Sequence, residues 1–276
     1  MRFPGRPLLL ELFATSNLAF LALDVSLAHS ANAFGAPLEW VPVAASAGCT
    51  LALVIGLGAA RELRRGAGWW IGMIVGGAAL LVGIAGMVLH LESQFFQTLT
   101  LRGLVYSAPF VAPLAYAGLG MILLLNRMVP GESIEWGQWL LLLALGGFAG
   151  NFVLSLADHA QNGFFNPLEW TAVAASALAV GFFTVAVVRP RGRPLYVSLL
   201  VVLVLQATTG VLGFVLHLRH LLDPTIANLG DRVLYGAPPF APLLFADLAL
   251  LGALGVWDLK AKGMFEESES VENPAE

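Results

Sequence analysis

The chain has 276 residues, of which 58% are hydrophobic and 12% are charged; its mean hydropathy is +0.80 and its net charge is -4. A soluble domain carries about 25% charged residues. This composition therefore predicts a membrane protein and excludes a soluble enzyme, a disordered chain and a nucleic-acid-binding protein. Cys49 is the only cysteine, which excludes an intrachain disulfide and a cysteine-based zinc site.

Long apolar segments predict transmembrane helices, because a bilayer core about 30 Å thick needs about 20 apolar residues in a helix. Eight such segments follow one another, at 8–29, 38–60, 69–92, 103–126, 137–160, 168–188, 194–218 and 233–256. The first segment is longer than the apolar region of a signal peptide, so we expect a retained helix. Glu11, near its start, is expected to be an interfacial residue that extends toward water.

Basic residues predict how these helices are oriented. Eight crossings place both termini on one side of the membrane, together with 11 of the 14 Lys and Arg residues. By the positive-inside rule, both termini are expected in the cytoplasm and the chain in the plasma (inner) membrane. Residues 261–276 are acidic and contain little to bury, which predicts a disordered cytoplasmic tail.

The sequence contains an internal duplication. Residues 29–47 and 159–177 align without gaps and share 12 of 19 residues, and two further blocks, 83–91 with 210–218 and 104–114 with 233–243, follow in the same order. The duplication predicts a four-helix repeat over 1–128 and a second over 129–260. Four is an even number, so both repeats enter the membrane in the same direction, related by a pseudo-twofold axis along the membrane normal.

Polar residues that are identical in the two halves are all expected near the extracytoplasmic face. Two imidazoles and one carboxylate from each half form a ligand set that suits Fe, Zn, Mn or Cu, and two separate sites or one dinuclear site would fit. The predicted metal ligands are His29, Glu39, His90, His159, Glu169 and His217. The residues predicted to support the metal or bind substrate are Asn32, Tyr106, Asn162, Tyr235, Asp158 and His220. Such a metal would suit redox or hydrolytic chemistry.

Glycine and proline residues surround this predicted site. Gly83 and Gly86 share a helix face with His90, and Gly210 and Gly213 do so with His217, which predicts close approach of a neighbouring backbone. The motif Tyr-x-x-Pro-x3-Pro begins at Tyr106 and again at Tyr235. Its prolines are expected to free the carbonyls of Val105, Pro109, Leu234 and Pro238, which a histidine N–H, a water or a cation would satisfy.

Three alternatives to a non-haem metal site stay open. Haem b would pair His29 with His90 and His159 with His217, and we rank it lower because the paired carboxylates would then have no role. An ion or solute transporter would use the intramembrane acids Asp24, Asp158 and Asp247. A structural subunit would use the polar sets to tie helix ends together, with other membrane subunits or further copies of the chain as partners. Trp40 and Trp170 are expected to be belt residues at the membrane interface.

Overall fold

The computed structural model describes residues 5–59, 63–223, 225 and 228–266, and the regular structure within these ranges is helical throughout. Six of its helices are long and apolar enough to cross a membrane, which bears out a polytopic helical membrane protein. They are α1 (Arg6–Ser30), α2 (Trp40–Ala59), α3 (Gly66–Glu92), α7 (Ile134–Gln161), α8 (Glu169–Val188) and α9 (Arg193–Leu222). A 3-10 turn, η1 (Pro37–Glu39), leads into α2.

The fourth and eighth apolar segments do not form single helices, so the prediction of continuous spans at 103–126 and 233–256 was wrong. The first is divided into α5 (Leu101–Val105) and α6 (Leu114–Met128), and the second into α10 (Leu229–Tyr235) and α11 (Leu243–Ala261). Pro113 and Pro242 are the N-caps of α6 and α11. Two prolines four residues apart remove backbone donors and obstruct the preceding turn, so each helix begins only after the second proline.

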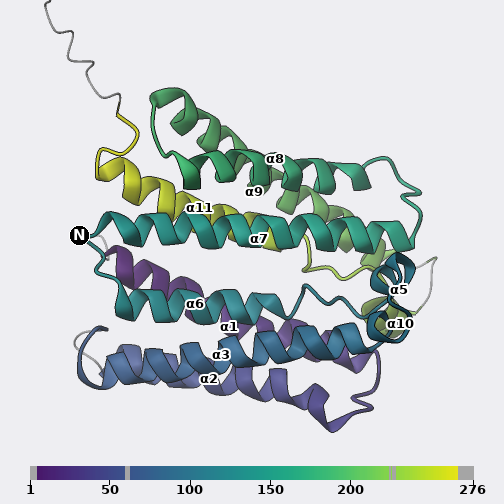
Figure 1. Ribbon diagram of the computed structural model, residues 1–276. Coiled ribbons are helices and arrows are strands. Elements are labelled where there is room, and N and C mark those ends of the chain that lie inside the picture. Colours follow the sequence, from purple (N-terminus) through teal and green to yellow (C-terminus); the bar gives the residue numbers. More distant parts are fainter. Residues whose placement is uncertain (1–4, 60–62, 224, 226–227, 267–276) are drawn as a thin grey trace, which may run out of the picture.

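Each half of the chain forms a four-helix bundle. In the first half α1 contacts α2, α2 contacts α3, α3 contacts α6 and α6 returns to α1; α7, α8, α9 and α11 contact one another in the same order. The long helices lie side by side (Figure 1). The short helix α4 (Phe95–Thr98) follows α3, and both α5 and α10 lie at the end of the molecule opposite the N-terminus.

The outer surface of these helices is apolar over their middle turns. Large hydrophobic side chains such as Leu51, Ile74, Leu81, Val201 and Val204 are more than half exposed. Exposure of such an apolar surface along several helices is unfavourable in water, whereas lipid chains would cover it. The surface therefore agrees with the apolar composition.

Glu11 does not extend toward water as the sequence predicted. Its carboxylate is buried, and both of its oxygens accept hydrogen bonds from the Arg127 guanidinium, at 2.6 and 2.5 Å. Asn126 adds a third donor at 3.1 Å, and Arg127 Nε–H donates to the carbonyl oxygen of Gly68. A charge removed from solvent requires such a partner, which the apolar context of Glu11 did not reveal.

A second ionic cluster joins the two halves at the same end of the bundle. Asp258, which is fully buried, accepts hydrogen bonds from Arg6 at 2.7 Å and from Lys262 at 2.5 Å. Phe265 is buried beyond α11, with its ring centroid 5.5 Å from that of Tyr196. The chain therefore packs against the bundle as far as Phe265, and residues 267–276 of the predicted tail lie outside the described residues.

Candidate functional site

The structure brings together the first histidine and the glutamate of each predicted set. His29 is in the last turn of α1 and Glu39 ends η1, while His159 is in the last turn of α7 and Glu169 begins α8. The distance from Nδ1 to Oε2 is 3.9 Å in the first pair and 3.5 Å in the second. In both pairs this Oε2 atom is buried and accepts no hydrogen bond from the described residues.

An aromatic pair closes the loop between each histidine and its glutamate. The rings of Phe34 and Trp40 stack with centroids 4.0 Å apart, and those of Phe164 and Trp170 do the same. Both phenylalanines have a φ of 51°, a left-handed conformation that is costly for a bulky residue. The sequence reasoning did not single out these phenylalanines, although both occupy the same position of the duplicated block. Trp40 and Trp170 are half exposed, as belt residues would be.

The second histidine of each set binds the broken helix next to it. His90, at the end of α3, forms a hydrogen bond of 2.9 Å between Nδ1 and the carbonyl oxygen of Pro109; His217, at the end of α9, forms one of 2.7 Å to that of Pro238. A carbonyl can only accept, so Nδ1 carries the proton in both rings. These bonds confirm that a histidine N–H donates to a carbonyl of the proline motif. The carbonyl of Pro109 also accepts from the backbone N–H of Ala112, at 3.1 Å. The carbonyl of Val105 accepts instead from Gln161, at 2.7 Å.

The glycines on the histidine face hold these contacts close, as predicted. A Cβ atom on Gly83 would lie 2.4 Å from the backbone nitrogen of Ala117, and one on Gly210 would lie 2.9 Å from that of Ala246. Gly86 and Gly213 would meet the rings of Pro113 and Pro242 in the same way, at 2.9 and 2.7 Å. Side chains at these positions would separate the histidine helices from the broken helices.

The full predicted ligand sets are only partly assembled. The rings of His29 and His90 have centroids 6.2 Å apart and are nearly perpendicular. Among the described residues, no group of three His, Cys, Asp or Glu side chains is arranged to hold a metal ion. The histidine–glutamate pairs therefore form the compact part of each set, with the second histidine nearby.

The predicted supporting residues lie around the pairs rather than between them. Asn32 and Asn162 are in the loops that follow the first histidines, where their backbone N–H groups donate to the carbonyls of His29 and His159. Tyr106 is half exposed beside Arg102, and His220 is exposed on the last turn of α9. The side chain of Tyr235 lies outside the described part of the structure.

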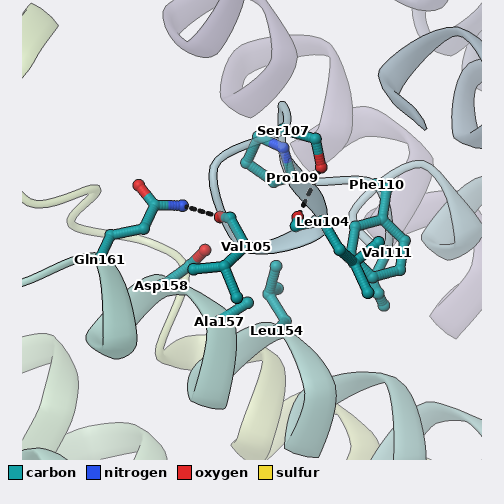
Figure 2. Close-up of a pocket in the computed structure, with 10 residues that line it drawn as sticks. All are labelled: Leu104, Val105, Ser107, Pro109, Phe110, Val111, Leu154, Ala157, Asp158 and Gln161. Carbon is teal, nitrogen blue, oxygen red and sulfur yellow. Dashed lines mark hydrogen bonds between the residues drawn. The ribbon is translucent and has the colours of Figure 1, made fainter. Parts of the chain in front are cut away.

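Two of the three intramembrane acids lie at the contact between the two halves. Asp247 on α11 accepts a hydrogen bond of 3.0 Å from Asn17 on α1. Asp158 on α7 lines a small cavity against the chain that joins α5 to α6, as Figure 2 shows. Asp24 is partly buried on α1. They therefore occupy separate places and do not form one cluster.

Comparison with known proteins finds no family model, no curated protein and no solved structure that matches this chain. Function is therefore inferred from the residues themselves.

Proposed function

We propose that this protein binds a divalent transition-metal ion at its histidine–glutamate pairs, with His90 and His217 as the additional ligands. The separation of the paired atoms carries the proposal. Distances of 3.9 and 3.5 Å between imidazole nitrogen and carboxylate oxygen are too long for a hydrogen bond. Two ligand atoms about 2.1 Å from one ion lie roughly 3.4 Å apart at a tetrahedral angle.

The protonation of His90 and His217 supports this role. A histidine that ligates a metal through one ring nitrogen normally donates its other N–H to a carbonyl or carboxylate, which fixes the tautomer. The Nδ1–H groups of both residues are held by proline carbonyls, so in the neutral form of each ring the lone pair is on Nε2. Two imidazoles that share an ion have centroids roughly 5–6.5 Å apart, and those of His29 and His90 are 6.2 Å apart.

We propose further that the chain is built from two parallel four-helix repeats that cross the membrane eight times, with α5–α6 and α10–α11 as broken spans. The contacts between halves support a pseudo-twofold axis: α1 contacts α11 and α10, while α7 contacts α6 and α5. When α1 is matched to α7, the contact of α1 with α11 corresponds to that of α7 with α6, and the contact of α1 with α10 corresponds to that of α7 with α5. An isologous interface has this reciprocal pattern. Basic residues favour cytoplasmic termini in the plasma membrane, which places both pairs at the extracytoplasmic face.

Metal analysis of the protein purified in detergent without chelators tests the proposed function. We expect near-stoichiometric Zn, Fe, Mn or Cu by plasma mass spectrometry. The double substitution His90→Ala and His217→Ala is expected to lower bound metal at least tenfold, because loss of even an indirect supporting group costs about 10–100-fold in affinity. Glu39→Gln with Glu169→Gln keeps the side-chain shape and is expected to do the same.

His220→Ala is the matched control, because it removes an imidazole from the same end of the bundle outside the paired sets. It is expected to keep the metal. Failure of the wild-type protein to take up any metal, together with unfolding of the His90→Ala and His217→Ala variant, would favour the alternative in which these histidines only fasten helix ends. A Soret band would instead identify haem b.

A further inference from the structure

A small cavity lies where the second half of the chain meets the broken helix of the first half. Its volume is about 10 Å³, which is close to the space that one water molecule needs. Asp158 and Gln161 of α7 face the chain between α5 and α6 across this cavity (Figure 2). None of the proposed transition-metal ligands lines the cavity.

A carboxylate and several other oxygens lie around this cavity. The Asp158 carboxylate has no hydrogen-bond or ion-pair partner among the described residues. Ser107 donates its hydroxyl to the carbonyl of Leu104, so the lone pairs of its oxygen stay available. Gln161 donates its amide N–H to the carbonyl of Val105, and its amide oxygen points away from the cavity (Figure 2). The backbone carbonyls of Ser107 and Phe110, two lining residues, accept no hydrogen bond from the described residues.

Such a set suits a hard cation. Carboxylate, hydroxyl and carbonyl oxygens are ligands of hard ions, and unwound backbone in a broken transmembrane helix is where membrane proteins coordinate Na⁺. A carboxylate inside a membrane needs a partner, and a cation would supply one.

The corresponding place on the other side of the pseudo-twofold axis lacks the carboxylate. The offset of 130 residues that aligns His29 with His159 pairs Asp158 with Ala28, and an offset of 129 pairs Val111 with Phe240. Val111 lines the cavity, whereas the ring of Phe240 contacts that of Phe20 with centroids 5.2 Å apart. Asp24 lies on α1 before the counterpart of Asp158, so it is a carboxylate outside the corresponding place.

We propose that Asp158 and the chain between α5 and α6 form a binding site for one small monovalent cation, Na⁺, at the interface of the two halves. Binding there would join α7 to the first half through an ion, in addition to the hydrogen bond from Gln161 to Val105. Ala28, in the equivalent position, supplies no carboxylate.

Thermal unfolding of the full-length protein in detergent tests this site, with NaCl, KCl and choline chloride compared at equal ionic strength. Saturating Na⁺ is expected to raise the melting temperature of the wild type by roughly 2–4 °C or more over choline, and K⁺ is expected to do less. Asp158→Asn is expected to abolish the Na⁺ effect, and Asp24→Asn is expected to preserve it. Leu154→Phe is expected to abolish the effect by filling the cavity.

A wild type that responds equally to Na⁺, K⁺ and choline would overturn the proposal, and so would an Asp158→Asn variant that keeps the full Na⁺ effect. If Asp158→Asn does not fold, Leu154→Phe decides, because it leaves the carboxylate in place. Retention of the Na⁺ effect by a folded Leu154→Phe variant would also refute the site.

Discussion

At the scale of single residues, two kinds of buried carboxylate differ in their partners. Glu11 and Arg127 are fully paired inside the bundle, whereas Oε2 of Glu39 and of Glu169 is buried without a hydrogen bond from the described residues. A buried polar atom without a partner costs roughly 1–3 kcal/mol. The paired ions therefore serve the fold, and the unpaired oxygens indicate where a ligand would gain most.

The buried pair gives a prediction on stability. Arg127→Met leaves the Glu11 carboxylate buried with only the Asn126 amide as a partner, and we expect a loss of about 3–5 kcal/mol in the free energy of unfolding. Titration with a denaturing detergent, followed by helical circular dichroism, measures this loss. Lys260→Met is the control, because the ion pair between Lys260 and Glu266 is exposed and is worth about 0–1 kcal/mol. Equal stability of both variants would contradict the structural role of the pair.

The sequence identified the residues of the candidate site, but it did not show which distant residues contact each other. The duplicated block marked His29, Glu39 and their counterparts, because identical residues at identical spacing do not arise from composition alone. It could not pair Glu11 with Arg127, since 116 positions separate them and only the tertiary fold brings them together. The left-handed conformation of Phe34 was not predicted, because the identity of a phenylalanine in a loop does not indicate its backbone conformation.

Among the helices, the broken ones are the most informative elements. The motif that starts at Tyr106 correctly predicted free carbonyls and histidine donors, yet the apolar run around it suggested a continuous helix. Hydropathy indicates whether a segment lies in lipid or in water, but not its backbone conformation. It therefore does not detect a helix break whose free backbone groups form hydrogen bonds with neighbouring side chains. The two prolines carried the signal for the break, and their spacing is a better guide to it than the apolar run.

Close packing of α3 against α6 gives a prediction at this scale. Gly83→Ala would place a methyl group 2.4 Å from the backbone nitrogen of Ala117, and we expect overpacking to cost about 1–3 kcal/mol. Gly77→Ala on the same helix meets nothing within 4 Å, so its higher helix propensity is expected to leave stability unchanged or raise it by about 0.5–1 kcal/mol. Melting temperatures of the two variants decide. A tolerated Gly83→Ala would argue against the close approach.

For the molecule as a whole, the proposed topology is testable by labelling. Cys49 can be replaced by Ala, after which Gln97→Cys, between α3 and α5, and Glu132→Cys, between α6 and α7, place single thiols at opposite ends of the bundle. We expect a membrane-impermeant maleimide to label the first in intact cells and the second only after the membrane is permeabilised. The reverse pattern would place the histidine–glutamate pairs on the cytoplasmic side.

X-ray absorption at the metal edge of the zinc-loaded protein tests most directly what the histidine–glutamate pairs bind. We predict imidazole scattering from histidine together with oxygen ligands, at distances of about 2.0–2.2 Å, and loss of the imidazole contribution in the His90→Ala and His217→Ala variant. A shell of oxygen alone, unchanged by those substitutions, would contradict a metal site at these histidines.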